Sequence, residues 1–525
     1  MRIGLIVRAV TTSWIAVIAN AVVGFLLTPY VLHHLGDEQF GLWILVTTVT
    51  GFYGFFDAGV RSSILRYVSK HHALGDSDGV RDVLATSFYF YVVGCFITIL
   101  LTFAMIPWLP HFFHIQGETA SSFQHLFLLA GIIQGVCLPL NVFIGALEAS
   151  ARFDQVYMAR VTGLVFRVVA VIAALRMGAG LFGLGAAVLL TNLLSYLIQI
   201  PLAIRVVPEF SVSPRWFDKA TLRKMTGYGA ITLTTGIGMQ LRTYLYPVIL
   251  AKYLSAVAVT IFSLPMKLLS FPLEGLATMT EVVNPVSSHL EAKQDYAKLR
   301  QLITLSVQTA FLIFIPMAVL LVVYGRELLT FWVGGKYASA YPLLVILTIG
   351  LGSSGTLSSV QSMLYGIEKH KGMMWFRLGE GFAIATLGIF MVHFWGLLGF
   401  AIVMGGVLFL TSLFFIPRHL CGIVGLRLRD YLVEGALKPL LVAIPMTVVL
   451  VGLHALHIVH GWPTLFAVAL AGGVTFLLTV LALGFMPPGA RPELLTVGVI
   501  DIIFERFVRN GKFRALFVVE AAPLK

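Results

Sequence analysis

The stretch TTSWIAVIANAVVGFLLTPYVL, at residues 11–32, carries no charged side chain over its whole length. A helix that crosses a bilayer needs about 20 consecutive, predominantly apolar residues, and this stretch meets that requirement. It is too long for the apolar region of a cleavable signal peptide, and no small-residue cleavage site precedes the next apolar stretch. We therefore expect it to stay in the protein as the first membrane-spanning helix.

The composition extends this expectation to the rest of the chain. Of the 525 residues, 58% are apolar and only 11% are charged. Soluble domains are about 45 to 50% apolar and about 25% charged, so these few charges cannot cover a water-facing surface. The pattern predicts an all-α polytopic membrane protein with about fourteen transmembrane helices. The expected spans are residues 11–32, 40–60, 83–106, 122–147, 157–175, 181–204, 226–250, 255–282, 301–325, 338–366, 373–393, 397–417, 431–453 and 462–485.

The basic residues are distributed unevenly along these spans. Most of the 36 Lys and Arg residues lie at the N-terminus, in the even-numbered connections and in the tail. The opposite connections hold four: Arg176, Lys252, Arg326 and Lys336. The positive-inside rule then places both termini of this multi-pass protein in the cytoplasm. This orientation accounts for most of the net charge of +12 without a nucleic-acid partner.

The chain also contains an internal repeat. A displacement of about 219 residues aligns Pro29 with Pro247, Asp76 with Asp295 and Arg81 with Arg300, in the same order along both halves. The repeat pairs the first six spans with the next six, and an even number of spans per unit makes the two lobes parallel. Two facing lobes are typical of a transporter that alternates access to a site between them.

The repeat and the loop lengths predict five parts. They are an N-terminal lobe at 1–207, a cytoplasmic linker at 208–225, a C-terminal lobe at 226–420, two further helices at 431–485 and a cytoplasmic amphipathic tail at 487–525.

Two motifs of the first hairpin carry a family resemblance. They are LGDEQFGLW at Leu35–Trp43 and FFDAGVRSSILRYVSK at Phe55–Lys70. Both resemble the Wzx-type O-antigen and polysaccharide flippases of the multidrug/oligosaccharidyl-lipid/polysaccharide (MOP) exporter superfamily. The resemblance implies a protein that moves an undecaprenyl-diphosphate-linked oligosaccharide from the cytoplasmic to the outer leaflet. It also implies a place in the bacterial cytoplasmic (inner) membrane, and a polysaccharide polymerase and glycosyltransferases as partners in the same pathway.

Charged residues at membrane depth are the candidates for the substrate site. An ionisable group there costs several kcal/mol unless it faces a partner or a wet cavity. Lys267 lies twelve residues past Ser255, about 18 Å into its span. Arg242 lies within the preceding span, about 12 Å from its outer end. We expect Lys267, Arg242 and Arg167 to bind an anionic diphosphate in a central cavity. The alternatives are that these side chains snorkel towards the membrane interface or form ion pairs within the protein.

Three further charged residues are candidates for gating or ion coupling. Glu274 follows Lys267 by seven residues, on nearly the same helix face, where it would be a counter-ion, a gate partner or a protonatable coupling group. The alternative is an ion pair at the cytoplasmic end of the span. Asp57 and Arg61 are four residues apart at the inner end of the second span, a spacing that permits a local pair and suggests a cytoplasmic gate or a hairpin brace. The repeat partners Pro29 and Pro247 are the expected hinges.

Other chemistries find no support in the sequence. The phosphate-binding pattern GxxxxGK[ST] is absent, so we expect neither ATP drive nor any other cofactor. Cys95, Cys137 and Cys421 lie in apolar runs without paired metal-ligand spacing, so we expect no metal site. The sequence contains no H-E-x-x-H motif and no dinucleotide-binding fingerprint between a predicted strand and a helix, so we expect the protein not to be an enzyme. The alternative function is an ion-coupled exporter of drugs or other small molecules in the same superfamily. A cationic cargo would require acids in the cavity, whereas the deepest charges are basic.

Overall fold

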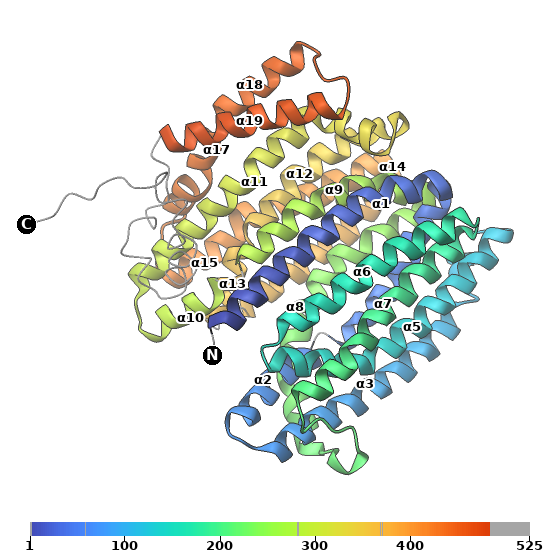
Figure 1. The fold of residues 1–525 in the computed structure, drawn as a ribbon. Coiled ribbons are helices and arrows are strands. Elements are labelled where there is room, and N and C mark those ends of the chain that lie inside the picture. The colour runs from blue at the N-terminus through green and yellow to red at the C-terminus, as the bar shows by residue number, and fades with distance from the viewer. Residues whose placement is uncertain (1–2, 58, 281–282, 368, 370, 483–525) are drawn as a thin grey trace, which may run out of the picture.

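The computed structural model describes residues 3–57, 59–280, 283–367, 369 and 371–482. Within these residues the chain is helical and contains no β-strand. Figure 1 shows long helices that run roughly parallel to one another, so the all-α prediction is confirmed. The predicted tail at 487–525 lies outside the described residues.

The helices form two lobes and a C-terminal addition. The first lobe comprises α1 (Ile3–Gly51), α2 (Val60–Ala73), α3 (Ser77–Met105), α4 (Leu109–Phe112), α5 (Glu118–Ala149), α6 (Phe153–Arg176) and α7 (Gly180–Val206). The second comprises α8 (Lys219–Tyr253), α9 (Ala256–Thr280), α10 (Val283–Ala292), α11 (Tyr296–Val333), α12 (Tyr341–Thr356), α13 (Ser358–Gly366) and α14 (Lys371–Leu410). After α14 come a π-helical turn η4 (Thr411–Phe415), α15 (Ile416–Val424), α16 (Leu428–Asp430), η5 (Tyr431–Leu437), α17 (Lys438–Val442), α18 (Ile444–Ala455) and α19 (Trp462–Ala482).

Two of the longest helices are each divided by a glycine. The backbone of α1 leaves the helical region at Gly36 (φ 75°, ψ 178°), and that of α14 does so at Gly396 (φ 55°, ψ −134°). Positive φ is readily accessible to glycine and unfavourable for other residues, so each glycine permits a turn between two antiparallel spans. Eleven helical stretches of the described residues are long and apolar enough to cross a membrane. Two of these stretches contain the glycine breaks, so each can supply two spans. Helix α8 is not among the eleven and can supply one more, so the described helices are compatible with the fourteen predicted spans.

The two lobes repeat the same order of elements. In each lobe a short helix, α2 or α10, precedes a long helix, α3 or α11. The Asp76 carboxylate accepts a hydrogen bond from the Gly79 amide at the start of α3, and the Asp295 carboxylate accepts one from the Lys298 amide at the start of α11. These backbone hydrogen bonds are the leading cause of the lowered pKa of both carboxyl groups. The aligned aspartates therefore have the same capping role, as a parallel repeat requires.

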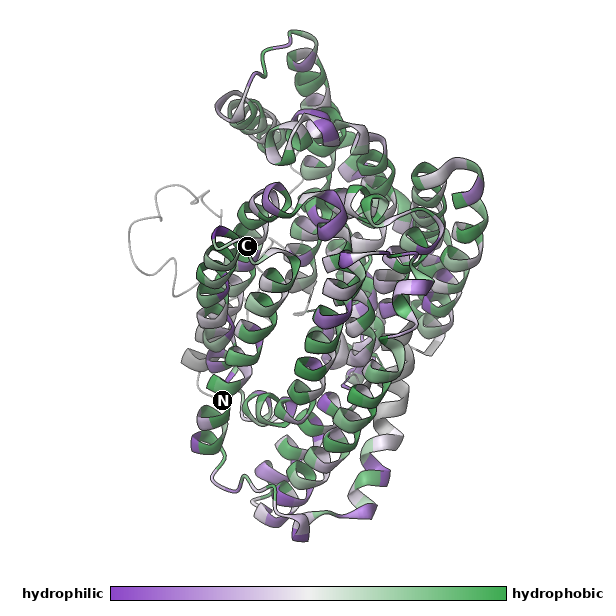
Figure 2. Cartoon of the chain, turned by 90° about the vertical axis from the view of Figure 1, so that its right-hand side faces the viewer, coloured by the Kyte–Doolittle hydropathy of each residue, from purple (hydrophilic) through white to green (hydrophobic). Residues whose placement is uncertain are grey.

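Large apolar side chains cover the outside of the bundle. Phe96, Leu100, Phe382 and Leu470 are each 69 to 71% exposed in the isolated chain. Figure 2 shows that the long helices are green, or hydrophobic, over much of their length. A soluble monomer does not expose so many large apolar groups, so these faces contact lipid.

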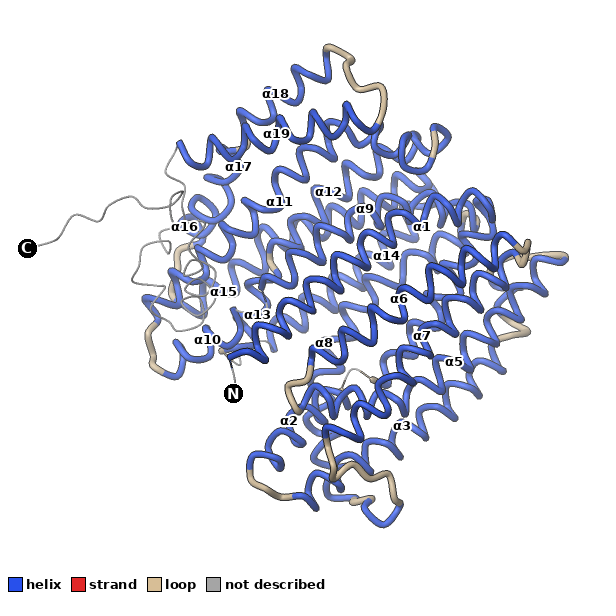
Figure 3. Tube along the Cα trace, in the orientation of Figure 1, coloured by secondary structure: helices blue, strands red, loops and turns tan. Residues whose placement is uncertain are grey.

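Helix α1 lies between the lobes. In Figure 1 and in the tube of Figure 3 it runs between α9 and α6, and it packs against both. The Phe25 ring of α1 stacks on Trp332 of α11 at 5.2 Å between centroids, and Trp332 Nε1 donates a hydrogen bond to the Phe25 carbonyl oxygen at 2.7 Å. The predicted linker, by contrast, packs on the first lobe: Tyr89 donates to the Val212 carbonyl and Ser63 to that of Met225.

Helices α12 and α14 approach each other closely enough to require glycine. A Cβ atom at Gly350 would lie 2.4 Å from Gly405 Cα, whereas one at Gly406 would meet nothing within 4 Å. We expect Gly350→Ala to lower the thermal unfolding midpoint of the purified protein in detergent by several degrees, because the backbones must move apart. Gly406→Ala should leave the midpoint unchanged or raise it slightly. Equal midpoints for the two variants would contradict the close approach.

Candidate functional site: a cationic cavity between the lobes

A cavity of about 530 Å³ lies between the lobes. It is lined by α1, α6, α7, α8 and α9, and the charged residues on its wall are Arg167, Lys267 and Glu274. A second cavity of about 400 Å³ adjoins it, and the two share Asn20, Leu164, Arg167 and Glu274. We refer to the first as the central cavity and to the second as the α6–α7 recess.

Lys267 reaches the central cavity from the middle of α9. It belongs to a polar stripe of Ser263, Lys267, Ser270 and Glu274, whose spacing of three or four residues places all four on one helix face. A Cβ atom at Gly24 of α1 would lie 3.9 Å from Lys267 Cε, an ordinary van der Waals distance, so the lysine stem passes close to α1 at this position. Within the described part of the chain, the Lys267 ammonium group forms no ion pair within 4.0 Å.

Arg167 reaches the same cavity from α6. Its guanidinium group lies within electrostatic range of the Lys267 ammonium group. Its Nε atom is buried and forms no hydrogen bond with any described residue. Two cations that repel each other in a site screened from bulk water favour an anionic ligand between them.

Glu274 lies at the boundary between the central cavity and the recess. Its carboxylate is exposed, hydrogen-bonds the Asn20 side chain of α1 and lies within electrostatic range of Lys267. The carboxylate therefore partly offsets the positive potential of the cavity. Its predicted role in gating or coupling stays a prediction.

Three other predicted residues lie on helices that surround the cavity. Arg242 belongs to α8, but its side chain lies outside the part that the structure describes. Pro29 and Pro247 lie within α1 and α8 without a break in either helix, and α1 turns instead at Gly36. The hinge role of the two prolines stays a prediction.

Asp57 and Arg61 lie at the other end of the first lobe and do not pair with each other. Arg61 forms a two-point ion pair with Glu148 of α5, with Nε 3.0 Å from Oε2. Asp57 Oδ1 instead accepts a hydrogen bond of 2.6 Å from the hydroxyl group of Tyr91, a fully buried side chain of α3. These contacts hold α2 and the end of η1 (Phe52–Phe56) onto the same lobe, and a gating role for the two residues stays a prediction.

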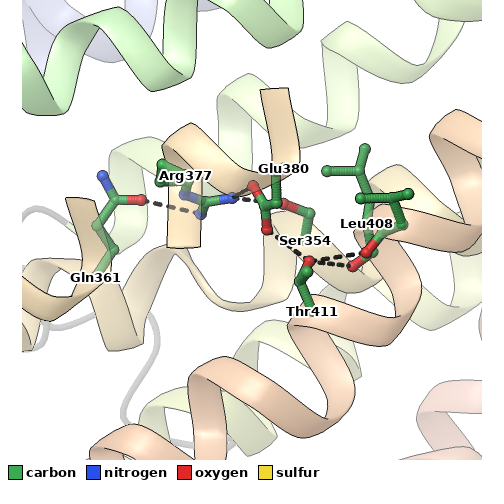
Figure 4. A network of polar contacts seen from close by, with 7 residues as sticks. Ser354, Gln361, Arg377, Glu380, Leu408 and Thr411 are labelled. Carbon is green, nitrogen blue, oxygen red and sulfur yellow. Dashed lines mark hydrogen bonds and ion pairs between the residues drawn. The ribbon is translucent and has the colours of Figure 1, made fainter. Parts of the chain in front are cut away.

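The second lobe contains a buried charge pair that the sequence analysis overlooked. Arg377 and Glu380 of α14 are 6% and 2% exposed, with 2.8 Å between Nη1 and Oε2. Figure 4 shows their partners: Arg377 also donates to Gln361 of α13 at 3.2 Å, and Thr411 of η4 donates to Glu380 at 2.5 Å. Neither charged residue lines the two cavities, so this network satisfies its own charges inside the lobe.

Two sequence signals could have identified this pair. The segment MMWFRLGEGF at residues 373–382 places a base and an acid three residues apart within a predicted span. That spacing puts the two side chains on one helix face, where they can neutralise each other.

At the Gly36 end of the molecule, contacts close the interface between the lobes. Asp37 Oδ1 of the first lobe accepts hydrogen bonds from Lys336 Nζ, at 2.8 Å, and from the Tyr337 hydroxyl group, both on η3 (Gly335–Ala340) of the second. The Thr260 hydroxyl group of α9 donates to the Asp37 carbonyl oxygen at 2.6 Å. At the opposite end the ribbons of α2 and α10 lie apart in Figure 1.

No metal centre is found in the described part of the chain. No three His, Cys, Asp or Glu side chains among those residues gather in a way that could hold a metal ion.

The buried pair gives a test of the second lobe. We expect Glu380→Gln to lower stability by about 3 to 5 kcal/mol, because Arg377 would be left buried without a counter-charge. The double variant Arg377→Leu with Glu380→Leu should recover much of that loss, since it removes both charges together. Thermal unfolding in detergent is the measurement.

The exposed pair Arg81 and Asp78 has the same spacing of three residues and serves as the control. Asp78→Asn should change stability by less than about 1 kcal/mol. A double variant of the buried pair that is less stable than Glu380→Gln would contradict this account.

The fold is shared with solved transporters. An inward-closed structure of the lipid II flippase MurJ matches with a TM-score of 0.70 and 13% identity, over 90% of this chain and 98% of that one. An inward-facing multidrug resistance MATE family transporter of the MOP superfamily matches with a TM-score of 0.66 and 14% identity, over 78% of this chain and 95% of that one.

Sequence comparison gives a more specific relationship. A Shigella flexneri protein described as "Putative O-antigen transporter" is 25% identical over 384 residues, which are 70% of this chain and 86% of the relative. The family model described as "Polysaccharide biosynthesis protein" matches residues 34–342, more than half of the chain and including both motifs of the first hairpin. The resemblance drawn from those motifs is confirmed, and the chain belongs to the polysaccharide biosynthesis protein family.

Proposed function

We propose that this protein is a flippase that moves an undecaprenyl-diphosphate-linked oligosaccharide from the cytoplasmic to the outer leaflet by alternating access. The observation that carries the proposal is the pair of cations, Lys267 and Arg167, on the wall of a cavity between two lobes. A diphosphate must leave bulk water to cross the membrane, and fixed cations in a cavity replace part of its hydration. The polyprenyl tail can remain in lipid during the crossing.

The charge balance of the cavity favours this cargo over a cationic drug. Among the described residues that line the central cavity and the recess, Arg160, Arg167 and Lys267 are basic and Glu274 is the single acid. A transporter of cations requires the opposite balance, because its substrate needs anionic counter-charge. The exporter alternative therefore has less support than the flippase.

The orientation follows from the basic residues. We place the end that carries α2 and α10 in the cytoplasm of a bacterial inner membrane, together with both termini. The contacts of Asp37 then close the outer end, while α2 and α10 lie apart at the cytoplasmic end. We propose that this arrangement receives cargo from the cytoplasmic leaflet, where glycosyltransferases of the same pathway would assemble it. After the crossing, a polymerase would receive the cargo at the outer leaflet.

Transport requires this arrangement to reverse. We propose that residues 1–207 and 226–420 move as the two lobes, that α1 and α8 bend near Pro29 and Pro247, and that the Asp37 contacts break when the outer end opens. Asp57, Arg61 and Glu274 are the proposed gating or coupling groups, because a carboxylate or ion pair near the cavity can change its partner between states.

Removal of the cavity cations should abolish transport. We expect Lys267→Ala and Arg167→Ala to eliminate surface polysaccharide in cells while the amount of protein in the membrane stays unchanged. Arg242→Ala tests the third predicted basic residue in the same way. Lys267→Arg should retain part of the activity because it keeps the positive charge. The measurement is quantitative immunoblotting of surface polysaccharide against protein level.

Lys298→Ala is the control variant, since Lys298 is a surface lysine paired with Asp295 outside the cavity. It should leave polysaccharide production at the wild-type level. Normal polysaccharide in both the Lys267 and the Arg167 variant would rule out charge capture.

The outer contact gives a second test. In a chain without Cys95, Cys137 and Cys421, we expect a bifunctional thiosulfonate to link Asp37→Cys with Lys336→Cys and to stop polysaccharide export, because the outer end cannot then open. Reduction of the link should restore export.

A cysteine pair at Asp295 and Lys298 is the matched control, because these residues form an ion pair three residues apart on one lobe. Linking that pair should not stop export. Full export with the Asp37 and Lys336 positions completely linked would contradict the alternating-access proposal.

A further inference from the structure

The α6–α7 recess has a different character from the central cavity. Its wall is more polar than that of the central cavity, with Tyr157 and Arg160 from α6 and Asn192, Tyr196 and Gln199 from α7. Its volume of about 400 Å³ lies within the range of about 300 to 1,000 Å³ that small-molecule sites occupy. Polar side chains at membrane depth are costly without polar partners, so the recess suits water or a polar ligand.

Helical spacing makes the recess a continuous feature of two helices. Asn192, Tyr196 and Gln199 are separated by four and three residues, so they share one face of α7. Tyr157, Arg160 and Arg167 are separated by three and seven residues on α6, and they share the opposing face. A Cβ atom at Gly163 would lie 1.7 Å from Ser195 Oγ, so a glycine lets the two helices meet beside the recess.

Gln199 shows an unused hydrogen-bonding capacity. Its side chain is 1% exposed, and its Nε2 atom donates to the Ser195 carbonyl oxygen at 2.9 Å. Its Oε1 atom is buried and has no hydrogen-bond partner among the described residues. The donation to Ser195 fixes the orientation of the amide, because a flipped amide would bring two oxygens together. An unsatisfied buried acceptor destabilises the free protein, and a hydroxyl donor from a ligand would satisfy it.

The groups around Gln199 complement a sugar. Arg167 Nε is a buried donor without a partner on the shared wall of the recess and the central cavity. An unused acceptor and an unused donor together suit hydroxyl groups, which both donate and accept. The Tyr157 and Tyr196 rings on the same wall offer apolar faces on which the C–H face of a pyranose can pack.

We propose that the α6–α7 recess is a saccharide subsite, in which Gln199 accepts a hydrogen bond from a sugar hydroxyl group. The sugar is the one attached to the diphosphate, because the recess shares Arg167 with the cationic wall of the central cavity. The diphosphate lies between Arg167 and Lys267, and the sugar extends towards Gln199. This inference rests on the proposed function, to which it adds the place where the glycan is recognised.

Binding measurements on the purified full-length protein in nanodiscs test the subsite. The probes are undecaprenyl diphosphate and undecaprenyl-diphosphate-N-acetylglucosamine. The sugar esterifies one ionisable oxygen of the terminal phosphate, so the two lipids differ in charge as well, and each variant is compared with the wild type for one lipid at a time. Gln199→Leu should weaken binding of the sugar-bearing lipid about fivefold to tenfold and leave binding of undecaprenyl diphosphate unchanged, because only one hydrogen bond to the sugar is lost.

Asn192→Leu provides a second variant with the same expected pattern, so the test does not depend on one substitution. Gln301→Leu is the control, because Gln301 is an exposed glutamine on α11 outside both cavities. It should bind both lipids as the wild type does.

Two results would overturn the inference. They are an equal loss for both lipids in Gln199→Leu, and no loss in either recess variant. In these cases the proposed function stands if the wild type still binds undecaprenyl diphosphate. If the wild type binds neither lipid, the proposed function itself fails.

Discussion

The free energy of placing a charge at membrane depth governs this structure. A charged group in the hydrocarbon layer must be paired or must face water or a ligand. The described helices contain both solutions. Arg377 and Glu380 neutralise each other inside the second lobe and receive further hydrogen bonds from Gln361 and Thr411. Lys267 and Arg167 face a shared cavity, where their charges remain available to a ligand.

The same constraint connects the cavity to the arrangement of the lobes. A wet, cationic space can exist at this depth because two parallel six-helix units enclose it, with α1 between them. Contacts at the Gly36 end, centred on Asp37, hold the two units together on that side. In our proposal the cavity therefore serves as the site and the Asp37 contacts as one of its two gates.

The sequence predicts much of this fold because lipid imposes a simple rule on each span. Long apolar stretches, the aligned aspartates Asp76 and Asp295 and the glycine at 396 are visible without coordinates. A single uncompensated charge such as Lys267 is equally visible. The partner of a charged residue is not visible in the sequence. Arg61 pairs with Glu148, which is 87 residues away, rather than with its neighbour Asp57. Arg377 was overlooked because a nearby acid on the same helix face makes the segment resemble a span end.

The claim that cations of the cavity carry a lipid-linked saccharide across the membrane is tested most directly by reconstitution. A fluorescent undecaprenyl-diphosphate-saccharide is placed in both leaflets of vesicles that contain the purified protein, and a membrane-impermeant quencher reports the lipid that reaches the outer leaflet. The account predicts fast, nearly complete quenching with the wild-type protein and, with Lys267→Ala, only the fraction that protein-free vesicles show. Equal quenching with the wild type and the variant would contradict it.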